Sequence, residues 1–385
     1  MDKKRSAVLF TLIFLTLVFG LGFLSFAGLA NYYINDEILN NEWSSELGNK
    51  FETDISSTFY KKFSFVNLNG AIRKMFGQHE MNGVVKLNNG YLTEISERCP
   101  DDAISEFISR TETFRNYLHE RGTSFVYVSA PSTVSPFDSE LPAGVEDYSN
   151  NNIDRLISGL RKAGIDTMDY RDILHSEGID QYSRMYKTDH HWTTEAGLHA
   201  YHLLESYIAE KTGCEIDPYI DDIENYSVIK FEKWHLGSRG QRTGICYAGI
   251  DDFILIDPNF DIAVVDPDGH AGTIHDYFFR KEYLETRDLT SRYTYDSVLG
   301  GANFLGHYRN PESKNDVRVM MITDSFAKAV IPYMIMQFAE VNTFYNGYVG
   351  NITPELIEAY DPDVVIMLYY PFVIHQNSGS FEFNF

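Results

Sequence analysis

The sequence has few cysteines: among its 385 residues only Cys99, Cys214 and Cys246 occur, and no two of them are close in the chain. No CxxC pair or Cys/His cluster has the spacing of a zinc site, so we expect no structural zinc. Three thiols allow at most one disulfide. Pairing of Cys214 with Cys246 and three separate, buried thiols both remain open from the sequence.

Basic residues are also scarce. The chain has 32 Lys and Arg against 55 Asp and Glu, which gives a formal net charge of -23. Binding to nucleic acid needs clustered basic side chains on the phosphates, so no nucleic-acid partner is expected. No internal repeat or low-complexity tract is present, which excludes a solenoid. The hydrophobic content of 44% is instead typical of a globular chain with a full core.

One long hydrophobic run lies near the N-terminus. Residues 1–5 are basic, and residues 7–30 follow without a charged side chain. A run of this length spans a bilayer as a helix, and the basic tip predicts a single-pass plasma-membrane protein with the rest of the chain on the extracytoplasmic side. The alternative is a cleaved signal peptide ending at residues 28–30. Both interpretations predict export.

Beyond the anchor (1–30), residues 31–98 read as a juxtamembrane lead-in and residues 99–385 as one α/β domain. Helices alternate with apolar strands in this domain, and such alternation predicts a parallel sheet with helices on both faces. Residues 215–310 break the alternation with short β-like runs, so we expect a β-rich insertion there. The expected helices cover about 104–118, 153–160, 194–211, from 327 and 354–360, and the strands 125–128, 165–169, 317–322, 341–344 and 364–368.

Two segments place reactive side chains where the carboxyl ends of such strands bind ligands. The first holds Asp189, His190 and His191 just before the helix that begins near Thr193 or Thr194. In an extended segment, residues two apart point the same way, so Asp189 and His191 share a face and His190 points elsewhere. A carboxylate beside an imidazole fixes its tautomer for proton transfer. A metal site and simple helix capping are the alternatives for this segment.

The second segment is an apolar strand that runs into Thr323-Asp324-Ser325 and opens a helix. A serine at such a turn is exposed, and its own backbone N–H lies at a helix N-terminus, where it can stabilise an oxyanion. Capping of the helix by Asp324 or Ser325 is the simpler alternative. With the first segment, Ser325, His191 and Asp189 form a complete set of nucleophile, general base and orienting acid.

The motif Asp-His-His-Trp-Thr at residues 189–193 resembles the signature of the bacterial DHHW family. These proteins look like the periplasmic SGNH-hydrolase-like proteins of alginate O-acetylation, whose Asp-x-His-Trp-Thr motif precedes a Gly-Asp-Ser-Phe block, so that the SGNH motif order is permuted. Residues 323–326 correspond to that second block. Further similar segments follow the family's order: 65–70, 90–92, 130–132, 237–244, 251–253 and 362–365.

The resemblance implies an SGNH-like α/β fold in which Asp189, His191 and Ser325 are catalytic, with no metal and no cofactor. Candidates for oxyanion or substrate contacts are Asn303, Arg239, Arg242 and His190. The chain departs from the family twice. Thr323 replaces the glycine before Asp-Ser, and residues 344–347 replace an Asp-x-Arg.

The function implied is acyl transfer, with a polysaccharide O-acetyltransferase as the first hypothesis and a membrane-bound O-acyltransferase as the donor's source. A carbohydrate acetylesterase would use the same residues, with water in place of the sugar hydroxyl. A non-catalytic scaffold or glycan-binding partner of such an acyltransferase is the third hypothesis.

Overall fold

The computed structural model describes residues 3–36, 59–300, 305–345, 350, 352–383 and 385. It comprises two units, Met1–Asn69 and Gly70–Phe385. The first contains helix α1 (Lys3–Asp36) and most of α3 (Lys62–Met75). Within α1, Arg5–Phe26 form 22 residues that are long and apolar enough to cross a membrane. At 1.5 Å per residue they span about 33 Å, which matches a hydrocarbon core. The N-terminal apolar helix predicted from the sequence is present.

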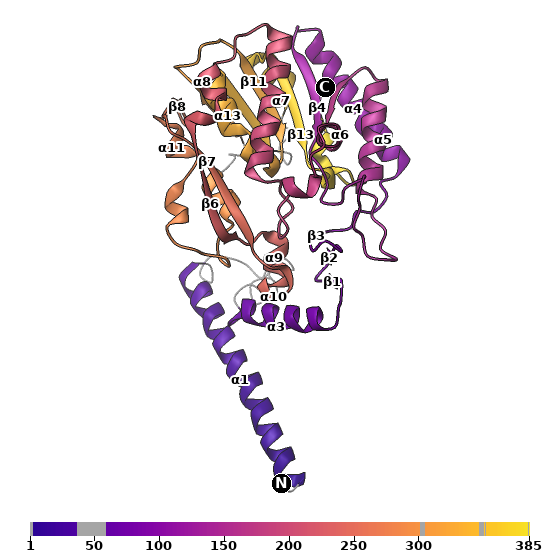
Figure 1. The fold of residues 1–385 in the computed structure, drawn as a ribbon, viewed down its shortest axis with the longest axis vertical. Coiled ribbons are helices and arrows are strands. Elements are labelled where there is room, and N and C mark those ends of the chain that lie inside the picture. The colour runs from indigo at the N-terminus through magenta and orange to yellow at the C-terminus, as the bar shows by residue number, and fades with distance from the viewer. Residues whose placement is uncertain (1–2, 37–58, 301–304, 346–349, 351, 384) are drawn as a thin grey trace. The chain divides into compact units, whose positions relative to one another are not determined.

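The second unit is built on an eight-stranded sheet in the order β5-β4-β13-β11-β12-β10-β8-β9. Neighbours from β5 to β12 pair in parallel, and the pairs from β12 to β9 are antiparallel. Figure 1 shows β4 and β13 side by side although they come from distant parts of the chain. The strands are β4 (Ser124–Ser129), β5 (Asp166–Asp169), β8 (Ala263–Val265), β9 (Ala271–Thr273), β10 (Leu305–Arg309), β11 (Arg318–Thr323), β12 (Glu340–Tyr345) and β13 (Val364–Tyr369).

Eleven α-helices of this unit are described after α3: α4 (Asp101–His119), α5 (Ser149–Lys162), α6 (Tyr170–Ser176), α7 (Thr194–Thr212), α8 (Pro218–Asp221), α9 (Ser238–Thr243), α10 (Ile245–Ala248), α11 (Ile274–Tyr277), α12 (Thr294–Leu299), α13 (Ile331–Gln337) and α14 (Pro354–Tyr360). Short 3-10 turns are η1 (Gln181–Arg184), η2 (Ile223–Asn225), η3 (Lys281–Leu284), η4 (Ser325–Ala329), η6 (Pro371–Val373) and η7 (Gly379–Phe381). The strands and helices expected in the α/β portion are present, with ends that differ by a few residues.

Successive residues of the central strands enter two separate cores. Val319 and Met321 of β11 pack in one core with side chains of α7 and α13, while Met320 and Ile322 pack in the other with α4 and α5. Alternation of this kind follows from the two-residue period of a strand buried on both faces. The predicted fold class, a parallel-rich α/β sheet with helices on both faces, is therefore confirmed.

Local sequence determines where helix α7 begins and ends. The Thr193 side chain caps the helix by accepting a hydrogen bond from the backbone N–H of Ala196 (3.3 Å). The helix ends at Gly213, whose φ of 72° is left-handed backbone that glycine adopts without strain. The start of α7 thus fixes the position of the residues just before Thr193.

Residues 215–310 contain the hairpin of β6 (Tyr226–His235) and β7 (Asp251–Pro258), together with strands β8, β9 and β10. Helix α8 precedes these strands and the short helices α9 to α12 lie between them, so the segment is mixed in secondary structure. A small three-stranded sheet consists of β1 (Glu80–Met81), β2 (Val84–Lys86) and β3 (Leu92–Thr93), in which β2 and β3 pair antiparallel.

The cysteines, all of which lie in the described part of the chain, form no disulfide. Cys99 is buried, Cys214 is half-buried and Cys246 is exposed. The pairing of Cys214 with Cys246, one of the two alternatives from the sequence, is therefore wrong.

Candidate active site

Ser325 lies at the carboxyl end of the central strand β11, where the chain turns into η4. Asp324 caps this turn, and its side chain accepts hydrogen bonds from the backbone N–H groups of Phe326 (2.9 Å) and Tyr370 (2.6 Å). Burial raises the pKa of Asp324 to about 6, although these two N–H groups favour the carboxylate. Ser325 itself is half-buried. The Asp324 side chain therefore ties the serine turn to the segment that follows β13.

The structure brings Ser325, His191 and Asp189 together. Ser325 Oγ lies 2.7 Å from His191 Nε2, and His191 Nδ1 lies 3.1 Å from Asp189 Oδ2. The serine and the histidine are 134 residues apart in the chain. His191 and Asp189 are buried. Both distances are within ordinary hydrogen-bond range, so one continuous chain of hydrogen bonds joins hydroxyl, imidazole and carboxylate.

Five hydrogen-bond donors surround the Asp189 carboxylate. Oδ1 accepts from the backbone N–H of His190 (2.8 Å), from the hydroxyl of Ser238 (3.0 Å) and from the Ser238 N–H (3.3 Å). Oδ2 lies 3.0 Å from Nε2 of His235, a fully buried residue, in addition to its contact with His191. Donors on both oxygens prevent the carboxylate from rotating away from His191.

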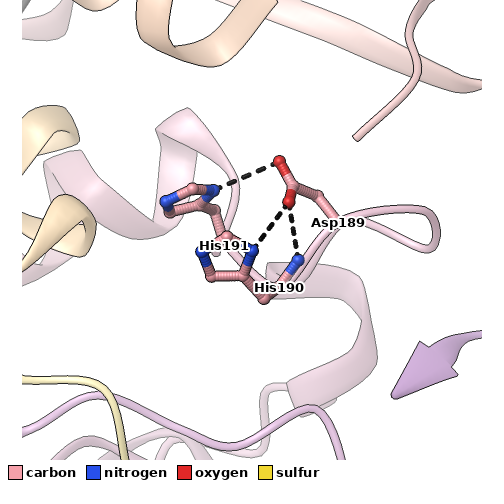
Figure 2. Close-up of side chains that lie close together, drawn as sticks. All are labelled: Asp189, His190 and His191. Carbon is pink, nitrogen blue, oxygen red and sulfur yellow. Dashed lines mark hydrogen bonds and ion pairs between the residues drawn. The ribbon is translucent and has the colours of Figure 1, made fainter. Parts of the chain in front are cut away.

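His190 does not point away from Asp189, and the expectation from the sequence was wrong on this point. Its Nδ1 lies 3.0 Å from Asp189 Oδ1 and 3.0 Å from Ser238 Oγ. Figure 2 shows the two imidazoles on the same side of the carboxylate, each directed at a different oxygen. The reason is that the segment is bent rather than extended: the N–H of Tyr186 donates to the carbonyl of His191 (3.2 Å), which closes a loop.

The electrostatic setting favours a neutral imidazole beside a charged carboxylate. Burial, reinforced by the neighbouring His190, lowers the pKa of His191 to about 4 against the opposing effect of Asp189. Burial alone would raise the pKa of Asp189, but the interactions with His191 and His190 outweigh it and hold that pKa well below its usual range. At neutral pH His191 is therefore unprotonated and able to accept a proton.

Three contacts hold the His191 imidazole and its loop against the turn that carries Ser325. The Tyr295 ring stacks on His191 with centroids 4.3 Å apart and an interplanar angle of 16°. Trp192 Nε1 donates to the carbonyl of Phe326 (2.9 Å), the residue directly after the serine. Gly197 of α7 lies so close to η4 that a Cβ there would be 2.3 Å from the Cβ of Ala329. The backbones approach each other this closely because position 197 has no side chain.

Tyr345 also lies near Ser325, at the same edge of the sheet. It ends β12, and its backbone pairs with Thr323 of β11. Burial raises the pKa of the Tyr345 hydroxyl, and hydrogen bonds with the side chain and the backbone of Ser325 lower it. The pairing with Thr323 places Tyr345 beside the turn that carries Ser325. Asn303, the oxyanion candidate from the sequence, lies outside the described residues.

The two arginine candidates have different environments. Arg239 is completely buried, and its guanidinium donates to the carbonyl of Leu92 (2.8 Å), to Thr133 Oγ1 (2.6 Å) and to the carbonyl of Asp189 (3.1 Å). It supports the backbone of the acid, and these donors already face protein groups. Arg242 is exposed and pairs with Glu94. Pairing with the surface carboxylate accounts for its position.

Sequence reasoning missed His235, Ser238 and Tyr295. His235 and Ser238 come from the end of β6 and the start of α9, at least 46 residues after Asp189. The glycine between them, Gly237, faces Asp189 so closely that a Cβ would be 2.2 Å from the Asp189 Cβ. A Trp-His-Leu-Gly-Ser run at residues 234–238, where a strand ends, is the local signal for this contact in the sequence.

Within the described residues, three groups of side chains have ligating atoms close enough to share a metal ion: Asp189 with His190 and His191, His202 with Glu205 and Asp221, and Asp266 with Asp268 and His270. In the first group both carboxylate oxygens already accept hydrogen bonds from protein donors. The first arrangement can move a proton from the serine hydroxyl to a neutral imidazole.

Residues 91–218 match the family model described as SGNH hydrolase-like domain, acetyltransferase AlgX. This match covers both the Asp-His segment and α7 and confirms the resemblance predicted from the sequence. No curated protein sequence matches the chain.

Two solved structures share the fold. PatB1 from Bacillus cereus superposes with a TM-score of 0.63 at 15% identity, over 78% of this chain and 99% of PatB1. A DHHW family protein from Eubacterium siraeum DSM 15702 superposes with a TM-score of 0.56 at 14% identity, over 79% of this chain and 96% of that protein. At these identities the likeness concerns the fold.

Proposed function

We propose, on the premise that this chain carries an SGNH hydrolase-like domain, that it is an extracytoplasmic O-acetyltransferase acting on a cell-surface or exported polysaccharide. The observation that carries the proposal is the hydrogen-bond chain from Ser325 through His191 to Asp189, with distances of 2.7 and 3.1 Å. The apolar helix Arg5–Phe26 supports anchoring in the plasma membrane, with the basic tip in the cytoplasm and the α/β domain outside.

In the first step Ser325 Oγ attacks the carbonyl carbon of an acetyl donor. His191 Nε2 takes the hydroxyl proton, and Asp189 stabilises the imidazolium that forms. The tetrahedral intermediate then expels the donor's alcohol or thiol, which takes the proton from His191. An acetyl ester on Ser325 remains. A membrane-bound O-acyltransferase is the partner that would deliver the donor across the membrane.

In the second step a sugar hydroxyl gives its proton to His191 Nε2 and attacks the acetyl-serine. Collapse of the second intermediate releases the acetylated sugar, and the proton on His191 returns to Ser325. The negative charge of each intermediate needs donors near Ser325. Its backbone N–H and the hydroxyl of Tyr345, which pairs with Thr323 beside the serine turn, are the donors that we assign to this role.

Water in place of the sugar would make the same residues an esterase, so the test must follow the acetyl group. We would incubate the full chain in detergent with a chromogenic acetyl ester, with and without acceptor glycans, and measure free acetate and acetylated glycan. Transfer to glycan that disappears in S325A, with an unchanged circular dichroism spectrum, is the expected result. Free acetate alone would establish an esterase, no turnover by the wild type would establish a non-catalytic protein, and equal turnover by S325A would refute the assignment of Ser325.

The nucleophile can be tested separately by covalent labelling. A sulfonyl adduct has been seen in PatB1 of Bacillus cereus, and sulfonyl fluorides react with activated serines. We expect a sulfonyl fluoride to modify the peptide that contains Ser325 in the wild type and to leave it unmodified in H191A. Labelling of another serine at equal rate in both proteins would argue against the assignment of Ser325.

A further inference from the structure

A second cluster of ionisable side chains lies on α7, well away from the serine. His202 and Glu205 are three residues apart on this helix and therefore lie on one face of it. Asp221, the last residue of α8, faces them. Glu205 is eleven residues after the start of α7, which corresponds to about 16 Å along the helix axis. The cluster is therefore separate from the candidate active site.

The hydrogen bonding of this cluster is incomplete. Glu205 is 4% exposed, and its Oε1 lies 3.2 Å from His202 Nδ1. Its second oxygen, Oε2, is buried and has no hydrogen-bond partner. Asp221 Oδ1 lies 2.5 Å from the same nitrogen of His202; this oxygen is buried, although the side chain as a whole is 40% exposed, and no other hydrogen bond to it is present among the described residues. Burial, reinforced by the nearby Glu205 carboxylate, raises the pKa of the Tyr201 hydroxyl, which is a third buried polar group without a hydrogen bond of good geometry.

Charge is also incompletely balanced. Two carboxylates and one imidazole have their ligating atoms within 4.8 Å of one another. Among the described residues, the ion-pair partner of both carboxylates is His202, and neither is paired with a lysine or arginine. A single imidazolium cannot balance two carboxylates, and an unpaired carboxylate oxygen in a buried setting is costly.

We propose that His202, Glu205 and Asp221 bind one divalent transition-metal cation. Such an ion would accept electron pairs from His202 Nδ1, from Glu205 and from Asp221 Oδ1, and it would replace the proton that Nδ1 otherwise donates to Glu205. An imidazole with two carboxylates is a donor set of Zn²⁺ or Mn²⁺, because Ca²⁺ and Mg²⁺ prefer oxygen ligands throughout. The ion's role is structural: it joins α8 to α7, the helix that follows the loop of His191.

The third group, Asp266 with Asp268 and His270, differs in a way that makes it a control. Its side chains lie in an exposed turn, and the Asp266 carboxylate accepts hydrogen bonds from the backbone N–H groups of Asp268 (3.0 Å) and His270 (2.8 Å). Those oxygens have partners already, so metal binding there is not expected.

The test is calorimetric titration of the EDTA-stripped full chain in detergent with ZnCl₂ and, separately, MnCl₂. We expect one equivalent of at least one of the two ions to bind and the Tm to rise on binding. E205Q keeps the buried volume, and D221N alters a side chain that is 40% exposed, so both variants should fold. Each is expected to weaken binding at least tenfold and to remove the rise in Tm.

Two control variants locate the ion. H270A removes a ligand of the exposed turn, and D189N alters the group beside the serine; both are expected to bind the ion as the wild type does. The proposal is overturned if the wild type binds neither ion, or if E205Q and D221N bind as tightly as the wild type. It is also overturned if D189N or H270A abolishes the binding. None of these readouts depends on acyl transfer, so the outcome is independent of the proposed function.

Discussion

Replacement of His235 by phenylalanine is predicted to lower acyl transfer strongly while leaving the protein folded. His235 Nε2 is 3.0 Å from Asp189 Oδ2, the same oxygen that lies 3.1 Å from His191 Nδ1. The imidazole never reaches the serine, so His235 acts as a positioning residue. In H235F the oxygen that faces His191 would retain His191 as its single donor, and the carboxylate could rotate.

The size of the effect follows from the type of bond lost. A hydrogen bond to a charged group contributes about 1.5–3 kcal/mol. If all of this energy is lost from the transition state, kcat/KM falls roughly 10- to 150-fold. Stability should change less, because His235 Nδ1 is buried without a hydrogen-bond partner and phenylalanine removes that unsatisfied group.

The assay is kcat/KM for a chromogenic acetyl ester, measured with the Tm of each variant. H235Q is the matched control, because its side-chain amide can still donate to Asp189, and we expect it to lose less activity than H235F. H235F should add little to D189N, since both act through the same carboxylate. Wild-type kcat/KM in folded H235F would refute the reasoning.

Three further predictions concern the surroundings of the site. Burial and a neighbouring imidazole lower the pKa of His191 to about 4. On acidification kcat/KM should therefore stay level and fall only as the pH drops through about 4. An inflection of the pH profile near 6.5 would contradict this. G237A should lose at least about tenfold in kcat, because its Cβ would lie 2.2 Å from that of Asp189. The φ of -72° at this position is ordinary for alanine, so the backbone itself would not be strained. Unchanged kinetics would show that the loop moves to accommodate the methyl group at little cost. R239M should lower the free energy of unfolding by about 3–5 kcal/mol, whereas R242M, on the surface, should change it by less than about 1 kcal/mol. Chemical denaturation measures both free energies, and equal effects of the two substitutions would contradict the reasoning from burial.

The main features of the fold could be predicted because they depend on local patterns. Strand β11 is an apolar run that stops at a polar turn, and α7 begins at a capping threonine, so both ends of the Ser325–His191 contact were recognisable separately. Parallel strands place their carboxyl ends at one edge of the sheet, which explains why residues 134 apart meet.

The remainder depends on tertiary placement that local sequence does not encode. His235 reaches Asp189 only because the β6–β7 hairpin and Gly237 pack against the loop before α7. The orientation of His190 was predicted wrongly because a period of two applies to an extended strand and the loop is closed by a backbone hydrogen bond. Arg239 looked like a sugar ligand in sequence, whereas its burial follows from contacts with Leu92 and Thr133, more than 100 residues earlier.

The same contacts explain why the site needs no partner to be assembled. The imidazole is held by Tyr295, the indole of Trp192 holds the serine turn, and the Asp189 carboxylate has five donors. Each of these groups belongs to the chain itself, so the geometry for proton transfer exists before any substrate binds. A membrane-bound acyltransferase would then affect the rate by supplying the donor. It follows that a small soluble acetyl ester should acylate Ser325 without that partner, whereas transfer to a polysaccharide from the natural donor should require it.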